Sequence, residues 1–329
     1  MKIKTNRRFK CTVSLLTVGA LALLPGCSSL SPEAPAQVTP GPASAIDNCG
    51  FTVELDVPPE RVVTVKSTPL ELLLALGQSS RIVGSAMLDG PVPQGLAPAE
   101  WEPNVLADQL PSREVLLAAE PDFVFAGWES NLGQDGLGTR TELLGLGINT
   151  YVAPPACVFG SESSDPLEFD DVFDMISEVG AMFDASNEAE SIISDQRSRL
   201  KAIPKNDGAL SALWFSSGED VPFVGGGTGT PSMIMRAAGL TNVAESEAQS
   251  WFSMPWESFV ASDPDVIVLV DAPWNSAEKK RALLEGHPAA SSMRAVKDER
   301  FIVVDFATTE AGVRNIDAVE SIANAAASQ

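Results

Sequence analysis

The chain has 329 residues, of which 44% are hydrophobic and 20% are charged, so it is long enough for two lobes with genuine cores. Its formal net charge of −22 argues against nucleic acid as a partner, because the phosphate backbone would repel such a surface. A single histidine and the absence of a G-x-S-x-G motif argue against a multi-histidine metal site and a hydrolase. We therefore expect no metal, no resident cofactor and no enzymatic activity.

The N-terminus has the pattern of an export signal. Five basic residues in MKIKTNRRFK precede the apolar run CTVSLLTVGALALL, which predicts a signal peptide over residues 1–26. The stretch Leu24-Pro25-Gly26-Cys27 resembles a bacterial lipobox, which implies that Cys27 carries a lipid and anchors the protein to the cell membrane outside the cytoplasm. A simple cleaved signal or a short anchor is the alternative. Residues 27–48, rich in Ser, Pro and Ala, are then a disordered tether.

Two of the four cysteines remain after the leader and the lipobox are set aside. Cys49 and Cys157 form an even pair in an oxidising compartment. A disulfide between them would close a loop of more than a hundred residues and stabilise the fold by roughly 4 to 5 kcal/mol in the chain-entropy model. Two buried thiols are the alternative.

Short strand patterns alternate with short helix patterns over residues 49–166, the predicted N-terminal lobe. The strand candidates are FTVELD, RVVTVK, RIVGSAM, DFVFAG and INTYVA. Helices are expected from Thr68-Pro69 to Gly77, with Thr68 as the N-cap, and after residues 112 and 139. This alternation predicts a parallel sheet with helices on both of its faces.

Two amphipathic helices in series make residues 167–204 a helical connector. EFDDVFDMISEVGAMF is the first, and Ser186 can cap the second, which has apolar residues at helical spacing. Residues 205–329 then restart the alternation as a C-terminal lobe, with strands in ALSALWFSS, DVIVLVD and RFIVVDF. The predicted fold is α/β: two Rossmann-like lobes, a helical connector, and a ligand cleft between the lobes.

Two short units of the sequence occur twice in the same order. Glu114, Pro121 and Asp122 recur 143 residues later as Glu257, Pro264 and Asp265. Thr68-Pro69 followed by Gly77 recurs 162 residues later as Thr230-Pro231 and Gly239. The difference of 19 residues is about the size of the Pro-rich loop after Met87, so one inserted loop accounts for it. The repeats indicate two equivalent lobes.

Two α/β lobes, a helical connector, a leader and a lipobox resemble the substrate-binding lipoproteins of ABC importers, in the class that binds vitamin B12, iron siderophores and haem. The words PPERVVTVKSTPLELLLALG and HPAASSMRAVKDERFIVVD carry this likeness, which covers residues 50–329. In that family one glutamate on each lobe docks on the two-fold dimer of permease subunits, and Glu114 and Glu257 are the matching positions. The alternative role of each glutamate is a favourable interaction with its helix dipole.

A closer resemblance is to an actinobacterial branch assigned to a deazaflavin coenzyme precursor. It rests on VKSTPLELLLALG, LDGPVP, FAGWESN, the Cys after YVAPPA, and PLEFDDVFDMISEVG. This likeness implies a planar, anionic, cofactor-like ligand. A ferric siderophore or a corrinoid is the alternative ligand, and an exported hydrolase is the alternative class of protein.

Candidate ligand residues lie in the loops that follow strands, where α/β sheets bind their ligands. Helix starts there offer N–H groups to an anion, and aromatic rings can stack on a flat ligand. The alternatives are a surface lysine, a flexible glycine turn and ordinary aromatic packing. The candidates are Lys66, Ser67, Thr68, Trp128, Glu129, Trp214, Gly226, Gly227, Thr228, Trp251, Trp274 and Arg314.

Overall fold

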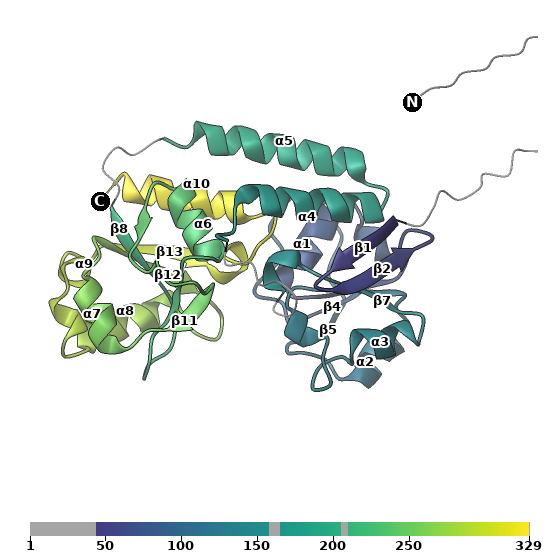
Figure 1. Cartoon of the computed structure of the whole chain (residues 1–329), viewed down its shortest axis with the longest axis horizontal. Coiled ribbons are helices and arrows are strands. Elements are labelled where there is room, and N and C mark those ends of the chain that lie inside the picture. Colours follow the sequence, from purple (N-terminus) through teal and green to yellow (C-terminus); the bar gives the residue numbers. More distant parts are fainter. Residues whose placement is uncertain (1–43, 158–164, 205–209, 329) are drawn as a thin grey trace, which may run out of the picture. The chain divides into compact units, whose positions relative to one another are not determined.

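The computed structural model describes residues 44–157, 165–204 and 210–328. Two separate β-sheets form the centres of an N-terminal and a C-terminal lobe, which Figure 1 colours purple to teal and green to yellow. The signal peptide predicted over residues 1–26, Cys27, and most of the predicted tether lie outside the described residues. Within the described ranges, no helix combines the length and the apolar character needed to cross a membrane.

The N-terminal lobe is a five-stranded parallel sheet in the order β5-β4-β3-β6-β7. Its strands are β3 (Val62–Val65), β4 (Ile82–Ala86), β5 (Val105–Ala107), β6 (Phe123–Ala126) and β7 (Asn149–Val152). Its helices are α1 (Ser67–Ala75), α2 (Arg113–Ala118) and α3 (Arg140–Leu144), with 3-10 turns at Ser79–Arg81, Glu129–Asn131 and Pro154–Ala156. The central strands β3 and β6 are buried along their whole length, as expected of a parallel sheet covered on both faces.

The C-terminal lobe has a mixed sheet in the order β11-β9-β8-β12-β13, with β10 pairing to β8. Its strands are β8 (Ser211–Ser217), β9 (Phe223–Gly225), β10 (Thr241–Asn242), β11 (Trp251–Ser253), β12 (Val266–Asp271) and β13 (Phe301–Asp305). Its helices are α6 (Thr230–Ala237), α7 (Trp256–Ser262), α8 (Ala277–Gly286), α9 (Arg294–Lys297) and α10 (Asn315–Ala326), with 3-10 turns at Ala290–Ser292 and Phe306–Thr308. The strands β9 and β11 pair antiparallel, unlike any strand of the N-terminal sheet.

The repeated Pro-Asp motif has the same structural role in both lobes. The residue before each proline, Glu120 or Asp263, has a left-handed backbone that ends the preceding helix. Asp122 then accepts hydrogen bonds from the N–H groups of Glu60 and Arg61 ahead of β3. Asp265 likewise accepts from the N–H and hydroxyl of Ser211 at the start of β8. The repeat therefore fixes where the neighbouring strand begins.

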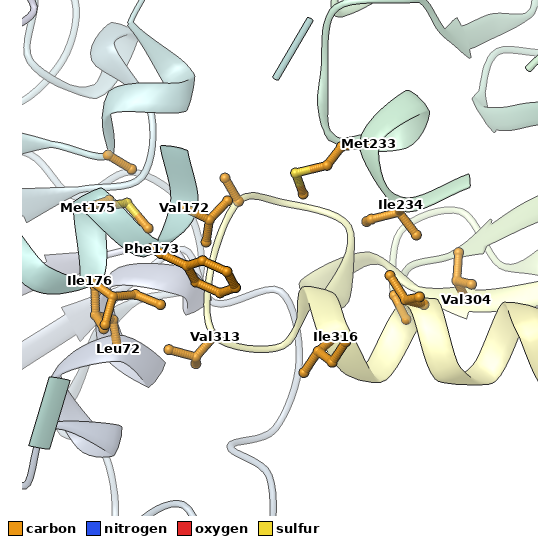
Figure 2. Close-up of a cluster of buried hydrophobic side chains, with 14 of the residues drawn as sticks. Leu72, Val172, Phe173, Met175, Ile176, Met233, Ile234, Val304, Val313 and Ile316 are labelled. Atoms are coloured by element: carbon orange, nitrogen blue, oxygen red, sulfur yellow. The ribbon is translucent and has the colours of Figure 1, made fainter. Parts of the chain in front are cut away.

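The helical connector consists of α4 (Phe169–Met182) and α5 (Ser186–Ala202), which pack on each other. Figure 2 shows Phe173 of α4 within a cluster that contains Leu72 of the N-terminal lobe and Ile234 and Ile316 of the C-terminal lobe. This largest hydrophobic cluster is therefore continuous through α4. The second connector helix contacts the C-terminal lobe through charges: Arg199 of α5 forms ion pairs with Asp317 and Glu320 of α10.

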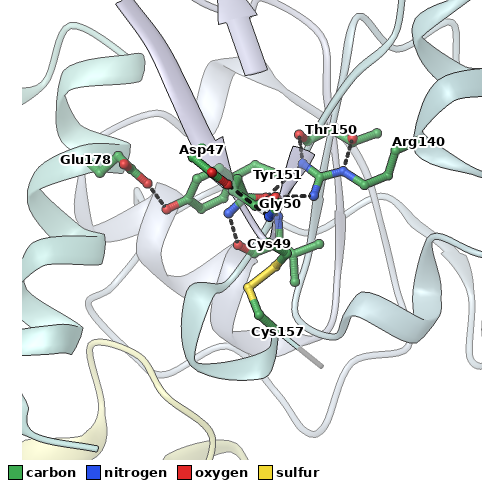
Figure 3. Close-up of a disulfide and its surroundings, with 10 residues drawn as sticks. Asp47, Cys49, Gly50, Arg140, Thr150, Tyr151, Cys157 and Glu178 are labelled. Carbon is green, nitrogen blue, oxygen red and sulfur yellow. Dashed lines mark hydrogen bonds between the residues drawn. A yellow bond between two sulfur atoms is a disulfide. The ribbon is translucent and has the colours of Figure 1, made fainter. Parts of the chain in front are cut away.

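Cys49 and Cys157 are joined by a disulfide. Figure 3 shows the bridge with Arg140 and Thr150 nearby. The side-chain amide of Asn48, which precedes Cys49, donates to the carbonyl of Val152 over 2.8 Å. Arg140 is buried there and donates to the carbonyl and side-chain oxygens of Asn48. The bridge thus ties the first hairpin of the described chain to the end of β7.

The structure corrects several expected boundaries. The predicted tether of residues 27–48 is wrong at its end, because β1 (Ser44–Asn48) pairs antiparallel with β2 (Phe51–Leu55). Helix α1 begins at Ser67, and its N-cap is Lys66, two residues ahead of the predicted N-cap Thr68. The helix α5 begins at Ser186 without a side-chain cap. Strands β5, β9, β10 and β11 were not predicted, because they are two or three residues long.

Candidate functional site

A cavity of about 690 Å³ lies between the two lobes, within the size range of small-molecule sites. Residues from the carboxyl ends of β3, β6 and β7 line one side. Residues from β8, β11 and the segments that follow β12 and β13 line the other. This is the edge at which parallel α/β sheets bind ligands.

Lys66 is tightly held at this cavity. It follows β3 directly, its φ is 83° and its side chain is almost fully buried. A non-glycine residue with such a backbone costs on the order of 1 to 3 kcal/mol, so the surrounding structure must hold it there. A Cβ at Gly127 would lie 2.8 Å from the Cβ of Lys66, so a glycine is required where the lysine passes.

The ammonium group of Lys66 lies in a cage of aromatic rings. Its Nζ is 4.0 Å from the ring centroid of Trp128, 4.8 Å from that of Phe306 and 5.7 Å from that of Trp274. Trp128 belongs to the N-terminal lobe, whereas Phe306 and Trp274 belong to the C-terminal lobe. Cation–π attraction therefore links the lobes through one lysine.

Asp89 is the counter-ion of Lys66 and also occupies the start of α1. Its carboxylate accepts from the Lys66 ammonium and from the backbone N–H of Ser67. The hydroxyl of Ser67 in turn accepts from the N–H of Asp89 over 2.8 Å. Burial raises the pKa of Asp89, and the Lys66 ammonium opposes that increase. The helix start that was expected to bind a ligand anion is thus filled by a carboxylate of the protein.

The C-terminal lobe contributes an aromatic wall. Trp251 stacks on Phe223 with ring centroids 6.1 Å apart, and Trp274 packs edge-on against Phe306 at 5.0 Å. The side chain of Trp274 is 56% exposed and is open to a ligand.

A buried lysine of α8 supports the segment that carries Trp274. Lys280 donates to the carbonyls of Val270 and Asn275, both over 2.6 Å, and thereby fixes both ends of that segment. Burial lowers the pKa of Lys280 to about 8.

A hydrogen bond crosses the cavity between Trp128 and Glu310. The indole Nε1 of Trp128 donates to Oε2 of Glu310 over 2.9 Å. Burial raises the pKa of Glu310, while the Trp128 bond and the Lys66 charge oppose that effect. A second contact between the lobes is the ion pair of Glu71 with Arg314, at 3.1 Å.

Half of the twelve predicted ligand residues line the cavity and half do not. Those that line it are Lys66, Thr68, Trp128, Glu129, Trp251 and Trp274. Those that do not are Ser67, Trp214, Gly226, Gly227, Thr228 and Arg314.

The glycine run was predicted to bind the ligand, but Gly226, Gly227 and Thr228 do not line the cavity and their N–H groups are already engaged. Those of Gly226, Gly227 and Thr228 donate to backbone carbonyls within residues 247–250. A Cβ at Gly227 would lie 2.0 Å from the carbonyl oxygen of Glu245. The run is glycine-rich so that two backbone segments can pack together.

Trp214 and Arg314 were also predicted to bind the ligand, and neither lines the cavity. Trp214 lies inside β8 rather than in a loop after it, and its side chain is fully buried in the core. Arg314 pairs with Glu71 and, at 3.7 Å, with Asp305, because the buried Glu71 carboxyl needs a counter-ion.

Sequence reasoning missed Asp89, Phe223, Phe306 and Glu310, all of which line the cavity. Phe306 directly follows β13, so the rule that ligands bind beyond strand ends could have found it. Asp89 lies within the quoted word LDGPVP, but its contact with Lys66 depends on a tertiary approach that has no local signal.

Glu114 and Glu257 are both exposed and lie in the first turns of α2 and α7. These helices carry the same repeated word in the two lobes. The hydroxyl of Ser112 contacts Oε2 of Glu114 at 3.1 Å. Within the described ranges, no group of three or more His, Cys, Asp or Glu side chains is arranged to hold a metal ion.

The chain is similar to several binding proteins over most of its length. It is 24% identical to an uncharacterised ABC transporter substrate-binding lipoprotein, YvrC, of Bacillus subtilis, over 86% of this chain and 84% of that one. It is 23% identical to a cobalamin-binding protein of Halobacterium salinarum, over 76% of this chain and 66% of that one.

The fold is also similar to that of a solved Fe3+-hydroxamate transport system protein of Saccharomonospora viridis. The TM-score is 0.74 and the identity 27%, over 86% of this chain and 98% of that one. The family model for periplasmic binding proteins matches residues 62–308, three quarters of the chain. The chain therefore belongs to the periplasmic binding protein family.

Proposed function

We propose that this protein is the extracytoplasmic substrate-binding subunit of an ABC importer. The observation that carries the proposal is the inter-lobe cavity, which is lined by aromatic rings and by other residues of both lobes. A cavity of this size between two lobes captures a small molecule without needing reactive groups of its own. A relative that is named an ABC transporter substrate-binding lipoprotein supports the same role.

The ligand we propose is a corrinoid or a ferric hydroxamate. Relatives named for cobalamin and for Fe3+-hydroxamate support these two classes. Both are bulky chelates that could cover the exposed Trp274 and the stacked pair of Trp251 and Phe223. A deazaflavin precursor, the first expectation, has a flat ring system that suits the same rings. An anionic form of the precursor would lie near Asp89 and Glu310. The single basic side chain among the described residues of the cleft, Lys66, is already paired with Asp89 and would not balance the ligand's charge.

Absorbance and thermal stability together test the ligand class. The exported protein is purified from a bacterial host, its visible spectrum is recorded, and its melting is followed with added cyanocobalamin, ferrioxamine B or a deazaflavin precursor. Ligands that bind the folded state raise the melting temperature by mass action. A shift with none of them would refute the proposed ligand classes, and turnover of a hydrolase substrate panel would favour an exported enzyme.

We further propose that Glu114 and Glu257 dock the two lobes on the two permease subunits. Charge pairs at such surfaces set orientation and association rate. The double variant Glu114→Arg/Glu257→Arg is expected to abolish uptake in cells while ligand affinity is retained. The matched control is Glu120→Arg/Glu278→Arg, two exposed glutamates of the same lobes. Equal loss of uptake in the control, or normal uptake in the double variant, would contradict docking.

Anchoring through Cys27 remains part of the proposal. It is supported by the lipobox-like sequence and by the relative described as a lipoprotein. Release of a Cys27→Ser protein into the medium is the expected result, and retention at the membrane would exclude a lipid anchor at that residue.

A further inference from the structure

The described residues of the cavity carry more negative than positive charge. Lys66 is the single base among them, whereas Asp89, Asp108, Glu129 and Glu310 are acids. The chain as a whole is also acidic, with a net charge of −22 that becomes −27 when the five basic residues of the leader are removed. An anionic ligand would therefore approach against the field of the whole molecule.

The positive charge of the cavity is already committed. Lys66 pairs with Asp89, and the backbone N–H of Ser67 at the start of α1 donates to the same carboxylate. The N–H groups of the glycine run on the opposite side donate to backbone carbonyls. An anionic group of a ligand would have to displace one of these bonds, and a buried charge without a partner is costly.

The aromatic rings and Glu310 offer the opposite environment. The Lys66 ammonium shows that the rings of Trp128, Phe306 and Trp274 accept a cation between the lobes. Glu310 adds a carboxylate held by Trp128, within the electrostatic range of Lys66 and Asp89. Burial disfavours the ionised form of Glu310, because the carboxylate loses its hydration. A cation beside it would offset that desolvation cost.

We propose that the cleft selects ligands with a cationic group, which binds beside Glu310 among the aromatic rings, and discriminates against the same ligands when that group is anionic. This inference rests on the proposed function as a binding protein for a corrinoid or a ferric hydroxamate. It specifies the charge of the ligand, which the fold does not.

Two charge series on constant scaffolds test the selection. One is ferrioxamine B with its free ammonium group, its neutral N-acetyl derivative and its anionic N-succinyl derivative. The other is aquacobalamin, cyanocobalamin and a cobalamin monocarboxylic acid. Affinity for the exported protein is measured by quenching of tryptophan fluorescence. We expect the cationic member to bind at least about tenfold more tightly than the anionic one, as for a charged hydrogen bond.

Two variants test whether Glu310 is the residue that causes the charge selectivity. Glu310→Gln keeps an acceptor for the Trp128 indole and is expected to reduce the affinity ratio between cationic and anionic members about tenfold. Glu278→Gln, an exposed acid of α8 away from the cavity, is the control and should leave the ratio unchanged.

The outcomes separate the two proposals. A flat or reversed charge series in the wild-type protein overturns the charge selection and leaves the binding function standing. An unchanged ratio in Glu310→Gln overturns the role of that residue. If no member of either series binds, the proposed ligand classes fail and this inference fails with them. The wild-type series decides the selection even if the variant does not fold.

Discussion

The two lobes share a frame but contribute different chemistry to the cleft. In both lobes a Pro-Asp motif precedes a buried strand. Its aspartate accepts a hydrogen bond from a backbone N–H at or just before the start of the neighbouring strand. Phe125 and Val268 are equivalent, because each lies three residues after the aspartate of the repeated Pro-Asp motif. Thr64 pairs with Phe125 and Trp214 pairs with Val268, so Thr64 is equivalent to Trp214. Two residues further on, Lys66 corresponds to Ser216. The N-terminal lobe therefore contributes a lysine where the C-terminal lobe contributes a hydroxyl.

The comparison separates the parts of the lobes that are alike from the parts that differ. The strand starts and the docking helices are alike, because both lobes need them to fold and, under the proposed function, to meet equivalent subunits. The strand ends differ, because Lys66 and Ser216 occupy corresponding places at the cavity and bring different side chains to it. The C-terminal sheet has an antiparallel edge that brings Trp251 and Phe223 to the cavity, where the N-terminal sheet has only parallel strands.

The disulfide belongs to the N-terminal lobe alone among the described residues, and its loss should have the largest effect. The bridge closes a loop with a sequence separation of 108 residues. In the chain-entropy model, the double variant Cys49→Ser/Cys157→Ser should lower the free energy of unfolding by about 4 to 5 kcal/mol. Urea unfolding of the oxidised, reduced and variant proteins measures it. A reduced protein as stable as the oxidised one would refute the prediction.

Equivalent positions in the two sheets should differ strongly in cost. Trp214 is fully buried, so Trp214→Ala should cost about 3 to 5 kcal/mol. Thr64 is smaller and bonds the hydroxyl of Ser85, so Thr64→Ala should cost about 1 to 2 kcal/mol. Urea unfolding compares the two. Trp214→Phe is the control, because the Trp214 indole N–H has no hydrogen-bond partner among the described residues. Equal losses at both positions would show that the lobes do not differ there.

The first helices of the lobes should respond differently to pH. Glu71 of α1 occupies the place of Met233 in α6, three residues after each Thr-Pro start. Burial raises the pKa of Glu71 from 4.5 to about 7, with Arg314 opposing it. The folded state thus binds the proton more tightly than the unfolded state, and stability falls as pH rises from about 4.5 through about 7.

This loss should amount to at most about 3 kcal/mol between pH 5 and pH 8. Glu71→Gln, which keeps a partner for Arg314, should flatten that part of the profile in urea unfolding at several pH values. Burial also raises the pKa of Asp89 and of Glu310, so a residual slope of the same sign is expected. Met233→Leu is the neutral control. A wild-type stability that increases over this range would contradict the sign.

The fold could be predicted from the sequence because its main strands and helices have local sequence patterns. Buried strands such as β6 and β12 are continuous apolar runs, and helix starts and ends carry Thr-Pro and Gly signals. The short strands β5, β9 and β11 have no period long enough to detect and form only when a neighbouring edge offers partners.

The site was less predictable for a physical reason. Strand-end position correctly brought Lys66, Trp128 and Trp274 to the cavity. It could not show that a carboxylate of the protein occupies the start of α1, or that Arg314 is committed to Glu71. These pairings join residues 22 or more positions apart in the chain, and local sequence does not encode them.

The cluster through α4 joins the cores of the two lobes, so we expect them to unfold as one cooperative unit. Phe173 and Ile176 are buried among side chains of both halves, so a fragment ending before the connector would expose half of a core to water. Calorimetry should accordingly give a single transition whose calorimetric and van't Hoff enthalpies agree. The lobes are then not separable modules: each brings its own strand ends to the cavity, but neither can be removed without exposing part of the shared core.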